Sequence, residues 1–334
     1  MAFAILARRY KWGGNPLTIA ISIKINDGLV LASDSASTFL GQGLNGELGV
    51  LNVYNNANKV FNLRKGFPIG AITWGAGSIG QASISTIIKD LRLIFTEGKN
   101  RPEWKLQKAK YTVQEVALRL KEFVFDELYV QAFPDVTSQR PDLGFIVAGY
   151  SAPDAPMAEE FQIDIKNGEC SEPKLLRGQE EIGITWGGDP EALNRIVTGM
   201  GGNLPHVLQS IFKIEANQLP KVMQLIQQQL QMPLVLPAMP LQDAIDLADF
   251  LVDLTIKFSR FSPGAPTVGG PIEIAAISKH EGFRWIKRKY YFDHRYNPGM
   301  EFSRFHECEK KEIHHNYQGG NNAADENEIG DARE

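Results

Sequence analysis

The sequence predicts an α+β fold in which antiparallel sheets are covered by helices. Alternating apolar residues and tight-turn signals recur at the front, in the middle and at the end of the chain, a pattern typical of β-hairpins. Between these stretches, apolar residues recur at the spacing of one helix face. Because hairpins and helices come in separate runs, their order indicates α+β layering and not a parallel sheet.

The first predicted hairpin begins at Thr18. Isoleucines at every second position of 19–25 indicate a half-buried strand, and Asn-Asp-Gly at 26–28 is a strong signal for a two-residue turn. The strand then returns over 29–33, and this register places Asp34 one residue from the position opposite Thr18. We therefore expect the side chains of Thr18 and Asp34 to meet.

The other elements follow from the same signals. A helix beginning after Thr112 has a capping box completed by Glu115, and an apolar helix face recurs over 84–95. Residues 39–57 are rich in glycine and asparagine and predict a loop. The remaining predictions are a hairpin of 59–63 and 68–74, strands over 144–150 and 161–165, a strand ending at 186–188 with a helix from about 190, a helical region over 203–240 broken by prolines, a helix over 241–258, and a hairpin of 272–278 and 283–286.

The bulk composition is that of an ordinary globular protein. The 334 residues are enough for one large domain or two smaller ones, and 43% of them are hydrophobic. A net charge of −4, from 35 basic and 39 acidic residues, leaves no electrostatic footprint for nucleic acid. No apolar run approaches the ~20 residues that span a bilayer. We therefore expect neither a nucleic-acid partner nor a membrane partner.

Two features of the sequence favour a cytoplasmic location. Only two cysteines occur, Cys170 and Cys308, in unlike surroundings, so we expect no disulfide framework and a reducing compartment. The apolar residues 1–6 precede a pair of arginines, which reverses the order found in secretory signal peptides.

Three segments of the chain together resemble a known family. Residues 18–38, 58–61 (Asn-Lys-Val-Phe) and 73–77 (Thr-Trp-Gly-Ala-Gly) resemble the proteasome β-subunit family of N-terminal nucleophile hydrolases. That family includes bacterial HslV-like and Anbu-type relatives. The stretch 269–274 is also similar to a family landmark. The resemblance covers roughly residues 18–286 and is strongest at the front.

The resemblance implies a four-layer αββα sandwich and a threonine-type peptidase or amidohydrolase. A threonine with a free α-amino group carries its own base. Thr18 would be the nucleophile, and its amine, with an ordinary pKa of ~7.7–8, would accept the hydroxyl proton. Lys59 would ease the hydroxyl toward alkoxide, and Asp34 would hold Lys59 charged and in place. The Gly75 amide would face the oxyanion, where one donor can contribute ~10²–10³ in rate.

The family further implies a homo-oligomer that acts on peptide or amide substrates without a metal or cofactor, while an ATPase partner stays an open question. The sequence departs from the family at two places. The position two residues past the acid, usually arginine, is Ala36. The stretch 265–270 lacks both the aspartate and the serine of an Asp-x-x-Ser-Gly-Gly group, and Thr267 is a candidate substitute. These losses keep open a catalytically inactive scaffold and a small-amide acylase as alternatives.

The resemblance also divides the chain. Residues 18–290 would form the hydrolase domain, with a helical insertion at about 203–240 that the family does not explain. Residues 291–334 would form a C-terminal extension, and the glycine-, asparagine- and acid-rich composition predicts disorder from about 318.

Residues 1–17 have two interpretations. In the first, they are a propeptide, although Leu17 stands where propeptides of the family commonly carry glycine. Alternatively, translation begins at the Leu17 codon, read as methionine in bacteria, and removal of that methionine bares Thr18. We favour the second interpretation.

Three other signals favour structural interpretations. Residues 75–80 spell Gly-x-Gly-x-x-Gly, but antiparallel hairpins precede them, so a tight turn is favoured over a dinucleotide site. The basic run 287–289 predicts a solvated face. The spacing of the terminal cluster matches no closed metal motif; the cluster comprises His294, His306, Cys308, His314 and His315.

Overall fold

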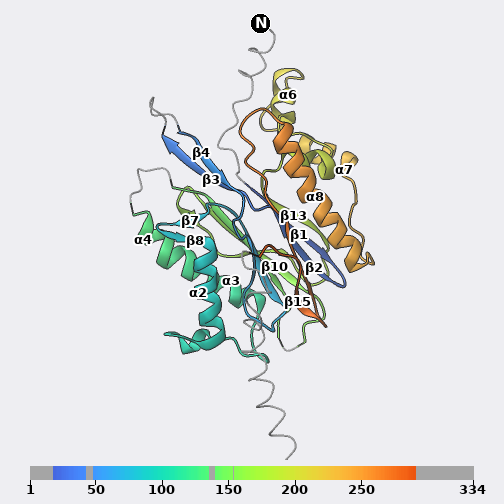
Figure 1. The fold of residues 1–334 in the computed structure, drawn as a ribbon. Helices are drawn as coiled ribbons and strands as arrows, with labels where there is room; N and C mark the ends of the chain where they lie inside the picture. The colour runs from blue at the N-terminus through green and yellow to red at the C-terminus, as the bar shows by residue number, and fades with distance from the viewer. Residues whose placement is uncertain (1–17, 43–47, 135–139, 153, 291–334) are drawn as a thin grey trace, which may run out of the picture. The chain divides into compact units, whose positions relative to one another are not determined.

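The computed structural model describes residues 18–42, 48–134, 140–152 and 154–290 (Figure 1). The described residues up to Lys289 belong to one compact unit. The predictions for residues 1–17, for the terminal histidine and cysteine cluster and for the tail lie outside the described residues.

Within the described residues, the first sheet has five antiparallel strands with the first hairpin at its centre. β1 and β2 pair in the predicted register, because Ile25 lies opposite Gly28. The last hairpin joins β2, and a strand from the middle of the chain joins β1. Across the sheet the order is β13 (Gly183–Gly188), β1 (Ile19–Ile25), β2 (Gly28–Ser33), β14 (Glu273–Ser278) and β15 (Gly282–Lys287).

The second sheet is also antiparallel and contains the predicted second hairpin. That hairpin pairs β5 with β6, and β6 continues into the pair that β9 and β10 form. Across the sheet the order is β11 (Glu169–Cys170), β10 (Glu159–Lys166), β9 (Leu143–Gly149), β6 (Ile69–Gly75) and β5 (Val60–Asn62), and β12 (Lys174–Arg177) pairs with β10.

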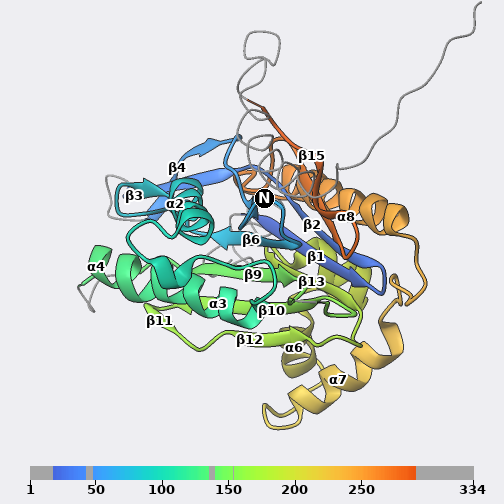
Figure 2. The same ribbon diagram turned by 90° about the horizontal axis from the view of Figure 1, so that it is seen from below.

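Apolar side chains pack in three groups around these sheets. The isoleucines of β1 belong to a group that joins the first sheet to helix α8 (Leu241–Phe261). A second group, with Leu31 and Ile146, joins the two sheets to each other. The third joins the second sheet to helices α2 (Ile84–Glu97) and α3 (Val113–Lys121), which lie over that sheet in Figure 2. The predicted α+β fold with helix-covered antiparallel sheets is therefore confirmed.

Strand β1 is buried on both faces, so the prediction of a half-buried strand is wrong. Its polar side chains find partners inside the protein. Ser22 donates its hydroxyl to the carboxylate of Glu160, and Lys24 donates Nζ to the carbonyls of Gly178 and Gln179, the latter at 3.0 Å. The second sheet covers this face of β1, and alternation in a sequence reports polarity and not exposure to water.

The predicted loop over 39–57 is also wrong in part. Strands β3 (Ser37–Gln42) and β4 (Leu48–Tyr54) form a separate hairpin whose register runs from Ser37 opposite Tyr54. Backbone pairing needs no particular side chain, so a high glycine and asparagine content lowers strand propensity without preventing a hairpin. A second short hairpin, β7 (Ser78–Ile79) with β8 (Ala82–Ser83), leads into α2.

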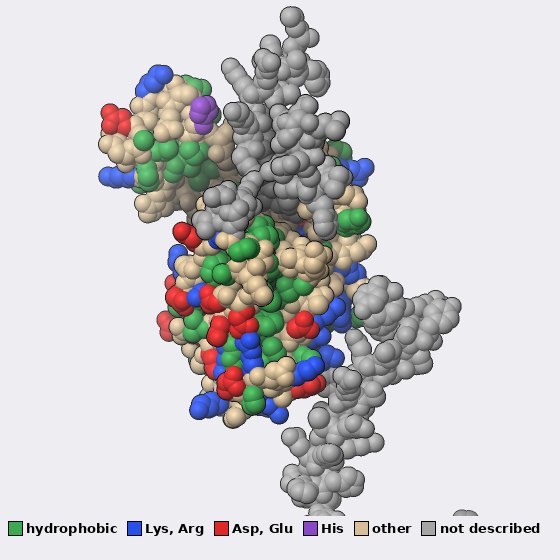
Figure 3. Space-filling model, turned by 90° about the vertical axis from the view of Figure 1, so that its left-hand side faces the viewer, with side chains coloured by type: hydrophobic (Ala, Val, Ile, Leu, Met, Phe, Trp, Pro, Cys, Tyr) green, Lys and Arg blue, Asp and Glu red, His purple; other side chains and the backbone are tan. Residues whose placement is uncertain are grey.

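The predicted helical insertion at 203–240 contains two helices, α6 (Leu204–Ser210) and α7 (Leu219–Leu230), and is not helical beyond them. Pro220 lies in the first turn of α7 and does not break a helix, because backbone amides of the first turn have no carbonyl partner within the helix. Figure 3 shows hydrophobic side chains gathered on the lobe at its upper left, which carries these helices. Large apolar residues exposed here are Ile211, Phe212, Leu225, Leu230, Met232 and Leu236.

Two helices continue into wider π-helical turns. The amide of Glu115 donates to the hydroxyl of Thr112 at 3.0 Å, which confirms the predicted start of α3. The chain then runs through η2 (Glu122–Tyr129) into α4 (Val130–Ala132). In the same way, α5 (Glu191–Leu193) continues into η3 (Asn194–Thr198), and the short element η1 (Pro102–Trp104) completes the fold.

None of the helices in the described ranges is both long and apolar enough to cross a membrane.

Candidate active site

The side chains of Thr18, Asp34 and Lys59 meet in one cluster. Thr18 directly precedes β1, Asp34 directly follows β2, and Lys59 directly precedes β5, so three strand ends supply them. Oγ1 of Thr18 donates to Oδ1 of Asp34 at 2.5 Å. Nζ of Lys59 donates to the same carboxylate oxygen at 2.6 Å and also to Oγ1 of Thr18. The expected contact between Thr18 and Asp34 is therefore present, and Lys59 joins it.

The cluster is closed to solvent. Thr18 and Asp34 have no exposed surface, and Lys59 is 7% exposed. Burial lowers the pKa of Lys59 because a charged ammonium loses its hydration, while the nearby carboxylates of Asp34 and Glu273 oppose that shift. A lysine amine with a lowered pKa gives up its proton more readily than an exposed lysine does, which suits proton transfer beside a hydroxyl.

Backbone amides hold the carboxylate of Asp34 in place. Its Oδ1 also accepts from the amide of Ile19 at 3.1 Å, and its Oδ2 accepts from Ala36 at 3.1 Å and Gly269 at 3.0 Å. The last two donors are backbone amides, so these hydrogen bonds need no particular side chain at positions 36 and 269. The stretch around Gly269 thus contributes to the site through its backbone.

The other two predicted site residues do not join the hydrogen-bonded cluster. Thr267 is buried, yet within the described residues no hydrogen bond links it to Thr18 or Asp34. Gly75 ends β6 with φ +90°, and an added Cβ would lie 2.4 Å from the carbonyl of Asp142. Glycine is required at this turn, but no hydrogen bond joins it to Thr18 in the part of the chain that the structure describes.

A glycine turn holds the backbone of Thr18 from the other side. An added Cβ at Gly188 would lie 2.1 Å from the carbonyl oxygen of Thr18, and that oxygen accepts from the amide of Asp189 at 2.7 Å. Burial raises the pKa of the Asp189 carboxyl. The end of β13 and the residue after it therefore fix Thr18, the residue that directly precedes β1.

Three further residues of the site were not predicted. Lys289 is mostly buried and donates Nζ to Glu273 at 3.1 Å and to the hydroxyl of Ser35 at 2.6 Å. The prediction that the basic run 287–289 forms a solvated face is therefore wrong at Lys289. The signal that could have found this pair is Glu273 itself, since an acidic residue inside an apolar strand requires a cationic partner.

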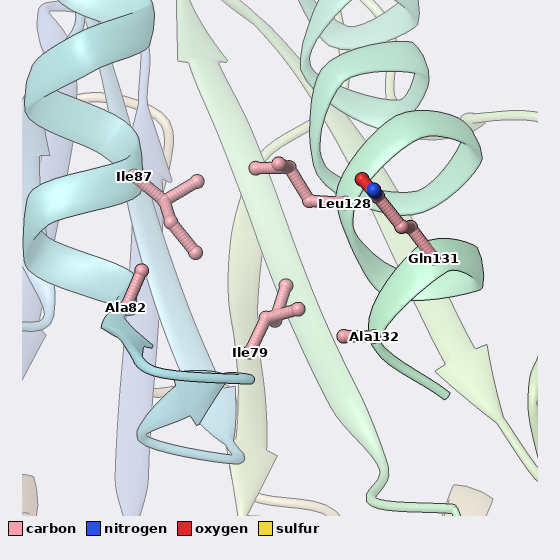
Figure 4. Close-up of a pocket in the computed structure, with 6 residues that line it drawn as sticks. All are labelled: Ile79, Ala82, Ile87, Leu128, Gln131 and Ala132. Atoms are coloured by element: carbon pink, nitrogen blue, oxygen red, sulfur yellow. The ribbon is translucent and has the colours of Figure 1, made fainter. Parts of the chain in front are cut away.

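A separate apolar pocket of about 190 Å³ lies between α2, the β7–β8 hairpin and the end of η2 with α4 (Figure 4). None of the three cluster residues lines it; its lining is Ile79, Ala82, Ile87, Leu128, Gln131 and Ala132.

No group of three or more histidine, cysteine or acidic side chains is arranged for a metal ion among the described residues.

Comparison with known proteins gives distant structural neighbours. No protein-family model and no curated protein matches the chain. Among solved structures, it is similar to Anbu (ancestral beta-subunit) from Yersinia bercovieri, at 14% identity and a TM-score of 0.44, and to the Anbu (Gly-1) mutant from Hyphomicrobium sp. strain MC1, at 13% and 0.43. Each alignment covers 91% of this chain and 99% of the neighbour. At this level of similarity, a functional assignment rests on the site residues.

Proposed function

We propose that this protein is a proteasome-like N-terminal threonine hydrolase that cleaves peptide or amide bonds with Thr18 as its nucleophile. The observation that carries the proposal is the hydroxyl of Thr18 held between the carboxylate of Asp34 and the amine of Lys59 in a buried cluster. A threonine with only a structural role needs neither a carboxylate nor an amine beside its hydroxyl. The hydroxyl of Thr18 has both, which is the environment of an activated nucleophile.

The reaction follows from the atoms present once the α-amino group of Thr18 is free. Oγ1 attacks the substrate carbonyl, and its proton passes to the α-amine. The positive charge of Lys59 lowers the pKa of that amine, so the amine is free to accept the proton. The oxyanion of the tetrahedral intermediate faces the amide of Gly75. Collapse expels the leaving amine, which takes the proton, and leaves an ester on Thr18. Water then releases the acid product and restores the hydroxyl.

The proposal requires that Thr18 become a chain terminus, because in the 334-residue chain its nitrogen is acylated by Leu17. Removal of 1–17, or translation from the Leu17 codon followed by removal of the initiating methionine, would achieve this. We propose further that the helix-covered sheets form an αββα sandwich, that residues 18–290 are one hydrolase domain with an insertion at 203–240, and that the protein works in the cytoplasm as a homo-oligomer.

The test is intact mass followed by covalent labelling. Protein made from its own gene context should begin at Thr18, and a β-lactone probe should then add one acyl group to that residue. The variant T18A should not be labelled, while T18S, which keeps a hydroxyl, should be labelled more slowly. Labelling of T18A at the wild-type rate, or a stable terminus at Met1 or Ala2, would contradict the proposal.

A catalytically inactive scaffold is the second candidate. It is favoured by Ala36 and by the loss of the polar pair in 265–270, together with the complete burial of Thr18. A scaffold would keep its assembly state in T18A and show no labelling of the wild type. A small-amide acylase would be labelled like a peptidase, and a length series of peptide amides separates the two, because a peptidase should prefer the longer substrates.

A further inference from the structure

Lys289 ties together three segments that meet beside the Thr18 cluster. Its Nζ contacts Oε2 of Glu273 at 3.1 Å, the hydroxyl of Ser35 at 2.6 Å and the carbonyl of Ala57. Ser35 is the neighbour of Asp34 in the chain, and Ala57 lies two residues before Lys59. One side chain from beyond β15 therefore links the strand ends that carry the acid and the lysine of the cluster.

Glu273 connects this link directly to Lys59. The carboxylate is 2% exposed, and its Oε2 accepts the backbone amide of Lys59 at 3.3 Å. Burial of a carboxylate without a cation is strongly unfavourable, so Glu273 depends on a partner in the interior. Lys289 is that partner: the side chain of Lys59 itself pairs with Asp34.

The charges around Lys59 balance only when Lys289 is counted. Two carboxylates face this region, Asp34 from the end of β2 and Glu273 from the start of β14. Lys59 and Lys289 are the two amines, and each makes one short ion pair. The backbone amide of Asp189, after β13, donates to the carbonyl oxygen of Thr18, and the carboxylate of Asp189 accepts the amide of Glu191 at 3.1 Å.

We propose that Lys289 is a positioning residue of the Thr18 site, which neutralises Glu273 and fixes the segments that carry Asp34 and Lys59. Its role in catalysis rests on the proposed hydrolase function. Its electrostatic role does not, because the ion pairs exist whether or not Thr18 reacts.

The proposal gives shifts of opposite sign for the two members of the pair. In K289M the negative charge of Glu273 is unbalanced, which favours the protonated form of Lys59 and of a free Thr18 amine. In E273Q the positive charge of Lys289 is unbalanced, which favours their neutral forms. Unit charges about 6 to 10 Å apart at an effective dielectric constant of ~20 shift a pKa by about one to two units.

The direct test is an NMR titration of the full chain labelled with ¹³C at lysine Cε, with the Lys59 signal identified from K59R. The pKa of Lys59 should rise by about one to two units in K289M, fall in E273Q, and return near the wild-type value in the double variant E273Q/K289M. K289R, which keeps the charge, should change it little. The matched control is K287M, because Lys287 is half exposed and pairs with Asp249 away from the cluster.

A second readout links this to activity. The pH profile of β-lactone labelling at Thr18 should move its acid limb upward in K289M and downward in E273Q. An unchanged Lys59 pKa in both single variants, or an equal shift in K287M, overturns the proposal whatever the activity. Absence of Thr18 labelling in the wild type, with the Lys59 shifts present, overturns the hydrolase function and leaves the electrostatic role of Lys289 standing. Should K289M fail to fold, E273Q still tests the sign of the Lys59 pKa shift, and K289R still tests whether a positive charge at position 289 is enough to keep that pKa unchanged.

Discussion

The indole of Trp74 lies directly on Gly187, where an added Cβ would come within 2.3 Å of the ring. The two residues belong to different sheets, β6 and β13. On the neighbouring strand, a Cβ at Gly144 would meet the same ring at 2.2 Å. Trp74 and Gly187 each adjoin a residue described at the site, since Gly75 follows Trp74 and Gly188 follows Gly187. The packing of the Trp74 ring against Gly144 and Gly187 therefore sets the distance between the two sheets next to Thr18.

We predict that Gly187→Ala destabilises the protein, because the new methyl group displaces the indole ring. Overpacking of this kind costs about 1–3 kcal/mol in free energy of unfolding, measured by urea denaturation. Gly178→Ala is the matched control, since its nearest neighbours lie at 3.8 Å or more from the added Cβ. The double variant W74L/G187A should lose less than the sum of the single changes. Additive losses would show that the ring and the methyl group do not collide.

Asp34→Asn should disable the site and weaken the fold together. The carboxylate accepts five hydrogen bonds, from Thr18, Ile19, Ala36, Lys59 and Gly269. An amide cannot accept at its nitrogen and leaves Lys59 without a counter-charge. Breaking a buried ion pair from one side costs about 3–5 kcal/mol.

We expect that loss in urea denaturation of D34N and a fall of at least ~10²-fold in β-lactone labelling of Thr18, comparable to the loss of one transition-state donor. D34N with wild-type labelling would show that the acid does not assist the nucleophile.

The buried pair of Glu160 and Arg177 should be among the strongest electrostatic contributions to stability. Nη1 of Arg177 contacts the fully buried carboxylate at 3.0 Å, and Ser22 donates to the same group. Arg177→Met should therefore cost about 3–5 kcal/mol in free energy of unfolding. Lys257→Met removes an exposed pair with Asp253 and should change stability by less than about 1 kcal/mol. A smaller loss of stability in E160Q/R177M than in R177M would assign the loss to the unpaired carboxylate of Glu160. An equal loss in R177M and E160Q/R177M would contradict that assignment.

The parts of the fold set by local signals could be predicted from the sequence. The turn at 26–28 fixes the register of β1 and β2, and that register alone brings Asp34 to Thr18. The pairing of Lys289 with Glu273 could not be predicted, because it depends on the neighbours that β14 receives across the sheet. In the same way, the sequence reports that one face of β1 is polar but not that a second sheet covers it.

The buried amine of Lys59 should make stability depend on pH. Burial lowers its pKa in the folded state, whereas the unfolded value is ~10.4, so between the two values the unfolded chain binds more protons. Stability therefore rises with pH across that window, and the destabilising contribution of a charged Lys59 is fully present below it. We predict that the difference in free energy of unfolding between wild type and Lys59→Met grows in favour of wild type from pH 7 to pH 10, measured in urea.

The comparison of two variants isolates Lys59 from the other buried groups. Burial raises the pKa values of Tyr111 and Tyr150 to about 12, so both lose stabilising effect as pH rises above ~10, but they are present in both proteins and cancel in the difference. Lys59→Arg, which stays charged throughout, should show the same widening difference and serves if Lys59→Met does not fold. A difference that stays constant or narrows with rising pH would mean that Lys59 keeps its proton as tightly in the folded protein as in the unfolded chain.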